Sequence, residues 1–184
     1  MLPRLFTVLL CLTAGLRAAY PEFSACKPNG GQRGSGFKLT VTGTRLEDFE
    51  TLLFYDPGFT VKSVEAVSAG KVDLTIAVAA DAALGSHLVR VRTRTGLSHP
   101  RQFFVSPYPT VDEKEPNSEF AQAQIIPLNS TIEGIILTED VDYFKVTVKK
   151  GQRISLEVDG LRLGYLNFDP YIAILDKDRF EKAF

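Results

Sequence analysis

Residues 71–78 read Lys-Val-Asp-Leu-Thr-Ile-Ala-Val, and this stretch decides the fold class. Apolar side chains stand at every second position, with Lys71, Asp73 and Thr75 between them. Because successive side chains of a strand point to opposite faces, the pattern predicts a strand with one buried and one solvated face. Further strand-like runs lie on both sides of it, at 37–42, 51–55, 89–93 and 103–105.

Turn-forming residues separate these runs. In Asp56-Pro57-Gly58, proline fixes one backbone angle and glycine tolerates a positive φ, so the three residues predict a tight turn. Short strands that alternate with such turns are typical of antiparallel sandwiches. We therefore expect an all-β protein in which residues 20–106 form a small sandwich.

A second region of strands follows an interruption. Pro107-Tyr108-Pro109 disfavours a central strand, so residues 107–111 are interpreted as a linker. Strands are then predicted at 131–136, 143–148, 152–158 and 171–175, with a helical turn at 119–124. Four strands leave unpaired edges and an uncovered face. We therefore interpret 112–184 as an incomplete β-sandwich in preference to a small complete domain.

The N-terminus has the layout of a secretory signal peptide. Arg4 precedes the apolar run 5–16, and the small residues Ala18 and Ala19 follow. The run is shorter than the ~20 residues that a membrane-spanning helix needs. We assign residues 1–19 to a signal peptide, with a buried helix as the alternative, and expect no membrane span. The predicted location is secreted, periplasmic or at the cell surface.

The charge balance and the absence of known catalytic motifs argue against several classes of function. With 21 Lys and Arg against 22 Asp and Glu, the net charge of −1 gives no global basis for binding nucleic acid. Serine-hydrolase elbow, zinc-protease, paired-cysteine and nucleotide-binding motifs are absent from the sequence. His87 and His99 have no acid or nucleophile at a recognisable spacing and are predicted to be surface residues. The sequence therefore favours a protein that is not an enzyme.

The second region contains a series of short motifs in a fixed order. They are Glu113-Lys-Glu-Pro-Asn117, Ala121-Gln-Ala123, Gly134, Asp140-Val-Asp142-Tyr-Phe144, Lys150-Gly151-Gln152 and Asp169-Pro170-Tyr171 with Asp176. Their order and spacing resemble the bacterial pre-peptidase C-terminal (PPC) domain. The resemblance implies a jelly-roll-like β-sandwich, here partial, of the kind appended to secreted bacterial enzymes, often peptidases.

The first region has its own set of motifs, mostly turn glycines: Pro28 to Gly34, Val41-Thr-Gly43, Tyr55-Asp-Pro-Gly58, Leu84-Gly85 and Gly96-Leu-Ser98. With these motifs it resembles an IPT/TIG-type immunoglobulin-like domain. It implies an immunoglobulin-like sandwich ahead of the PPC-like unit.

One group of residues suits a metal ion. Glu113, Glu115 and Asn117 stand at alternate positions, so on an extended segment they point the same way. Glu139, Asp140 and Asp142 precede a predicted strand. Oxygen ligands in this number suit Ca²⁺. The segment is also similar to the calcium-binding E-x-E-x-N segment of collagen-binding modules in bacterial collagenases, although Ser118 stands where that pattern is often acidic. The alternative is a solvated acidic linker.

These expectations combine into a non-catalytic exported accessory module that serves in binding, spacing or stabilisation. Two alternatives stay open: a fragment of a secreted peptidase whose catalytic domain lies elsewhere, and a calcium-stiffened adhesion or structural spacer. The expected partners are an extracellular polymer or a linked peptidase domain. The oligomeric state is left open.

Overall fold

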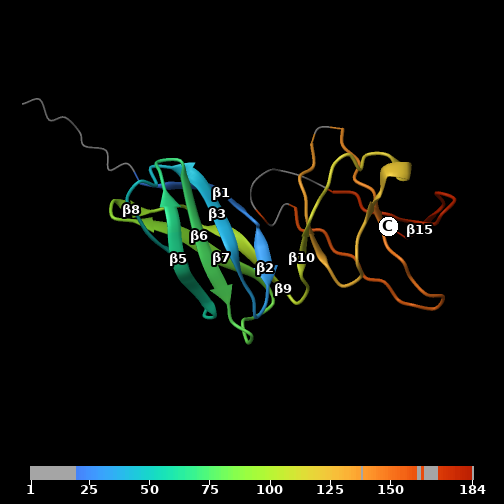
Figure 1. The fold of residues 1–184 in the computed structure, drawn as a ribbon, viewed down its shortest axis with the longest axis horizontal. Helices are drawn as coiled ribbons and strands as arrows, with labels where there is room; N and C mark the ends of the chain where they lie inside the picture. Colours follow the sequence, from blue (N-terminus) through green and yellow to red (C-terminus); the bar gives the residue numbers. More distant parts are fainter. Residues whose placement is uncertain (1–19, 138, 161–162, 164–169, 184) are drawn as a thin grey trace, which may run out of the picture.

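The computed structural model describes residues 20–137, 139–160, 163 and 170–183. The predicted signal peptide at 1–19 lies outside these residues, as does Asp169. Two units follow one another along the chain, a first unit at 20–106 and a second unit at 107–183 (Figure 1). The all-β prediction is confirmed. Within the described residues, no helix is long and apolar enough to cross a membrane.

The first unit is a sandwich of two sheets. Its strands are β1 (Glu22–Lys27), β2 (Gly30–Gln32), β3 (Gly36–Thr44), β4 (Phe49–Phe54), β5 (Phe59–Val67), β6 (Lys71–Val78), β7 (Gly85–Thr93), β8 (Gly96–Leu97) and β9 (Arg101–Ser106). Sheet A has the order β1-β3-β6-β5, and sheet B has the order β2-β9-β7-β4 with β8 paired to β7. The strands predicted at 37–42, 71–78, 89–93 and 103–105 lie within these elements, and the one predicted at 51–55 matches β4 except for its last residue, Tyr55.

Alternation in β6 builds the core as expected. Val72, Leu74 and Ile76 are buried, and β6 pairs antiparallel with β3 so that Leu39 lies opposite Leu74. On sheet B, Phe103 is fully buried and contacts the rings of neighbouring phenylalanines, namely Phe37, Phe54 and Phe59. The turn at 56–58 is confirmed, with Gly58 at φ 99°.

The prediction of a surface position is wrong for His87. Its side chain is buried, with Nδ1 2.8 Å from Asp56 Oδ2 and Nε2 2.9 Å from the Ala83 carbonyl oxygen. Phe59 packs against the ring. Two hydrogen-bond partners offset the cost of burying a polar ring, which the sequence alone did not reveal. His99 is exposed, as predicted.

The second unit has much less regular structure than predicted. Its elements are β10 (Thr110–Asp112), the 3-10 turn η1 (Phe120–Gln122), β11 (Gln124–Ile125), β12 (Thr131–Glu133), β13 (Phe144–Lys145), β14 (Ile174–Leu175) and β15 (Glu181–Ala183). They form three two-stranded sheets, with β10–β12 and β11–β13 parallel and β14–β15 antiparallel. The predicted helical turn at 119–124 contains η1.

Several strand predictions for this unit are wrong. No strand forms within 152–158, and only β13 and β14 form within 143–148 and 171–175. The predicted inner side chains Phe144, Val148 and Leu156 are exposed. Among the described residues after Ser106, no apolar side chain is buried. Without a covering layer, apolar alternation gains little from forming a strand.

Hydrogen bonds join the two units at the edge of sheet B. Asn29 donates from its backbone N and its Nδ2 to Glu133 Oε1, at 2.9 and 2.6 Å. Thr131 Oγ1 donates to Ser106 Oγ at 2.6 Å. Thr131 and Glu133 both lie on β12, which pairs with β10, so these hydrogen bonds tie the strand at the end of the predicted linker to the first unit.

Candidate metal centre

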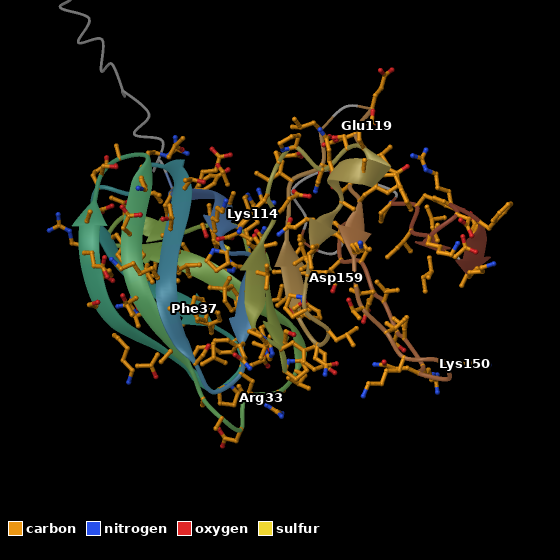
Figure 2. The ribbon with its side chains drawn as sticks, turned by 45° about the vertical axis from the view of Figure 1, so that its right-hand side comes forward. Arg33, Phe37, Lys114, Glu119, Lys150 and Asp159 are labelled. Atoms are coloured by element: carbon orange, nitrogen blue, oxygen red, sulfur yellow. The ribbon has the colours of Figure 1, made fainter. Side chains whose placement is uncertain are left out.

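The candidate centre is built on the segment that follows β10. The amide N of Glu113 donates to the Glu133 carbonyl oxygen and continues the β10–β12 pairing by one residue. Gln124 holds the next turn, because Lys114 N donates to its Oε1 at 2.8 Å and its Nε2 donates to the Asp112 carbonyl oxygen. In Figure 2 the labelled Lys114 marks where this segment leaves the boundary between the units, and Glu119 marks the start of η1.

Three of the predicted ligands converge. Carboxylate oxygens of Glu113, Glu115 and Asp142 lie within 4.8 Å of one another. Asp142 reaches the other two because Tyr143 N donates to the Asn117 carbonyl oxygen, which places the start of β13 beside the 113–117 segment. Residues far apart in the chain thus meet at one point, as the sequence analysis expected for an oxygen-rich site.

Asn117 lies at the base of this carboxylate cluster. It is fully buried, its backbone N donates to Glu115 Oε2, and its Nδ2 donates to Glu113 Oε1, both at 2.9 Å. Its Oδ1 is buried and accepts no hydrogen bond from the described residues, and the same is true of Asp142 Oδ1. Asn117 Oδ1 lies beside the cluster, and Asp142 Oδ1 belongs to one of its three carboxylates. Both are buried oxygens without a hydrogen-bond donor, and a cation could coordinate them.

The electrostatics of the cluster are unfavourable without a cation. Burial is the largest cause that raises the pKa of Asp142, followed by the nearby charges of Glu113, Asp140 and Glu115, and together with a side-chain hydrogen bond to Glu113 they bring it to about 6. A carboxyl group among other carboxylates resists ionisation because like charges repel in a partly desolvated site. A divalent cation would reverse this penalty.

Glycine at 134 lets the backbone of the 133–135 segment approach Glu113. A Cβ atom on Gly134 would lie 2.7 Å from Glu113 Oε2, and the same oxygen accepts a hydrogen bond from Ile135 N at 2.8 Å. In the sequence, Gly134 stands out only as part of a motif. Its role in orienting Glu113 depends on a pairing between segments that no local pattern reveals.

The two remaining predicted ligands lie outside the three-carboxylate group. Asp140 accepts hydrogen bonds from Ser118 Oγ on one oxygen and from Leu137 N on the other, which makes it the organiser of a turn. Its charge still acts on Asp142. Glu139 is exposed and has a positive φ of 59°. Ser118, which stands where the calcium-binding pattern is often acidic, contacts Asp140.

Comparisons with known proteins identify no family. No family model matches the chain, and no curated protein matches it. Among solved structures, the chain is similar to the Bacteroides ovatus mixed-linkage glucan utilization locus protein SGBP-B, in complex with a mixed-linkage heptasaccharide. The identity is 22% and the TM-score 0.30, and the match covers 42% of this chain and 21% of that one. A likeness at this level carries no argument about function.

Proposed function

We propose that the chain is a non-catalytic, exported accessory module whose second unit binds Ca²⁺ through Glu113, Glu115 and Asp142. The single observation that supports this proposal is the carboxylate cluster together with the buried Oδ1 atoms of Asn117 and Asp142, which lack donors. The signal-like N-terminus supports export to the outside of the cell, where calcium is abundant.

Calcium fits the donor set better than other common metals. Every candidate ligand atom is a carboxylate or amide oxygen, and the cluster contains no histidine or cysteine. Hard oxygen ligands disfavour zinc and copper, and an irregular set of oxygens suits Ca²⁺ better than Mg²⁺, which requires near-octahedral geometry. Bound calcium would join the segment after β10 to the start of β13 and so stiffen a unit in whose described residues no apolar side chain is buried.

Stiffening is the basis of the proposed role. A rigid second unit would serve as a spacer or binding module beside an extracellular polymer or a linked peptidase domain. Calcium binding and stability are thermodynamically linked, because a ligand that binds only the folded form stabilises it by about 2.7 kcal/mol at a hundred times its Kd.

Titration calorimetry of the metal-free chain with CaCl₂ tests the proposal. We expect binding of one ion, a higher melting temperature with calcium, and at least about a tenfold loss of affinity in Glu115→Gln, which is roughly 1.4 kcal/mol. The matched control is Glu119→Gln, an exposed glutamate outside the cluster. Absence of calcium binding at millimolar concentration, or equal binding by both variants, would contradict the proposal.

The raised pKa of Asp142 gives a second readout. Its folded value of about 6 lies above the ordinary value of about 4, so between these limits the metal-free folded chain holds more protons than the unfolded chain. Stability without metal should therefore fall as the pH rises through this window. Calcium requires the ionised carboxylate, so its affinity should rise over the same window and binding should release protons. Calorimetry in buffers of different ionisation enthalpy measures that release.

A further inference from the structure

The outer faces of the two sheets in the first unit differ in chemistry. On sheet A, two pairs of opposite charges lie across neighbouring positions: Lys38 Nζ lies 3.2 Å from Glu65 Oε2, and Lys71 Nζ lies 2.8 Å from Asp73 Oδ2. Thr40 and Thr75 donate hydrogen bonds to the same two carboxylates. This face satisfies its own polar groups and is typical of a solvated surface.

The outer face of sheet B is apolar and basic. We define the β4–β7 outer face by six side chains: Leu53, Tyr55, Leu88, Leu97, Arg90 and Arg92. The three leucines and Tyr55 are exposed, and Tyr55 has the largest exposed fraction of the four, 56%. They alternate with the buried residues Leu52, Val89 and Val91, which fixes them on the outer side of the sheet.

Strand pairing places these side chains in one continuous patch. Leu53 lies opposite Arg90, and Arg92 lies opposite Leu97. Tyr55 lies beside Leu88, because its backbone N donates a hydrogen bond to the Leu88 carbonyl oxygen. Contiguous exposed apolar side chains that include tyrosine and arginine are characteristic of protein interaction surfaces.

The arginines of this face are incompletely neutralised. Arg92 Nε donates to Glu50 Oε2 at 2.7 Å. Arg90 forms no ion pair with the described carboxylates; its guanidinium lies over the Tyr55 ring, 5.8 Å from the centroid. Its Nε is buried and makes no hydrogen bond to the described residues. Arg90, beside Tyr55, therefore carries the charge of this face that no described carboxylate pairs, whereas Arg92 is already paired with Glu50.

We propose that the β4–β7 outer face docks an extended acidic and apolar segment of a partner protein. Arg90 and Arg92 are two residues apart on one strand, about 6.6–6.8 Å, which equals the repeat between alternate side chains of an extended partner. Carboxylates at alternate positions would meet the arginines, and apolar side chains would cover the leucines. Three leucines beside one tyrosine favour apolar side chains over sugar rings. The same face of a second copy is disfavoured because it would oppose arginine to arginine.

The test uses the exported chain and a short synthetic peptide. The peptide carries leucine at two alternate positions and glutamate at the next two, with serine between, and binding is followed by amide chemical shifts and peptide fluorescence polarisation. We expect shifts at Tyr55, Leu88 and Arg90 and affinity that falls with salt. We also expect a loss of affinity of about tenfold or more in Arg90→Glu. The matched control is Lys38→Glu on sheet A, which should bind as the wild type does.

Peptide variants and two alternative occupants complete the test. Replacing the glutamates by lysine or the leucines by serine should abolish the shifts. The proposal is overturned if these peptides bind equally, if polygalacturonate binds in preference to the acidic peptide, or if the chain dimerises through this face. Melting curves of each variant confirm that it is folded, and Arg90→Gln, which removes the charge without reversing it, should show an intermediate loss.

Discussion

The two units use similar sequence patterns with different results. Of the residues that the structure describes, the 15 apolar ones that form the buried core run from Phe23 to Val105, in the first unit. In the described part of the second unit the only buried side chain is that of Asn117, a polar residue at the carboxylate cluster. Both units contain runs in which apolar and polar residues alternate, so alternation by itself does not produce a core.

The difference teaches that an apolar face needs a covering layer. In the first unit, β6 is flanked by β3 and β5, and its inner side chains meet those of sheet B. In the second unit, each sheet formed by the described residues has two strands, and such a sheet is marginally stable without a layer to pack against. The organised feature there is polar: a set of oxygens fixed by hydrogen bonds. We therefore expect core substitutions to dominate the stability of the first unit, and cation binding that of the second.

Removing the central aromatic ring of the first unit gives the largest expected effect. Phe103 is fully buried among three other phenylalanine rings. Phe103→Ala should lower the free energy of unfolding by about 3–5 kcal/mol, through lost burial and an unfilled cavity. Urea unfolding followed by circular dichroism measures the change. A loss below about 1 kcal/mol, the cost typical of an ordinary substitution, would show that the sandwich core is not the main source of stability.

The sequence predicted the fold best where local pattern and tertiary packing agree. Residues 71–78 form β6 because their apolar side chains have a partner sheet. The strand β5 was missed although Phe59 and Val61 pack on the core, because its alternation is irregular and its pairing with β6 contains two register shifts. Residues 152–158 alternate clearly and form no strand, because the covering layer is a tertiary property.

The candidate site follows the same rule. Spacing along one segment identified Glu113, Glu115 and Asn117, and proximity in sequence to a strand identified Asp142. Sequence reasoning could not separate Asp142 from Glu139 and Asp140, because the choice depends on the hydrogen bond from Tyr143 to Asn117. Local sequence patterns also do not reveal that Gly134 lets the backbone approach Glu113, or that Asn29 is the hydrogen-bond partner of Glu133.

The junction between the units gives the next largest expected effect. Glu133 is largely buried, which raises its pKa, and both of its hydrogen bonds from Asn29 reach one oxygen. Asn29→Ala removes one donor and should cost about 1.5–3 kcal/mol, the range for a hydrogen bond to a charged group. It should also speed tryptic cleavage at Lys114, just beyond the junction.

Ser86→Ala is the control for the junction, because Ser86 donates an exposed hydrogen bond to Gln102 on sheet B and leaves the junction intact. It should change neither stability nor cleavage appreciably. Equal cleavage rates in the two variants would mean that only the covalent chain couples the two units. The units would then differ in core packing and also move independently of each other.

The smallest expected effect comes from removing an apolar side chain of the second unit that is exposed, whereas Phe103 of the first unit is buried. Leu156 belongs to an alternating run, yet its side chain is 54% exposed. Leu156→Ser should change the free energy of unfolding by no more than about 0.5 kcal/mol, since exposed substitutions rarely do more. The same urea experiment measures it, with and without calcium, and Val91→Ser in the fully buried row of β7 is the matched control. A loss from Leu156→Ser as large as that from Val91→Ser would place Leu156 in a packed core. Alternation would then mark buried faces in both units, and the contrast between them would fail.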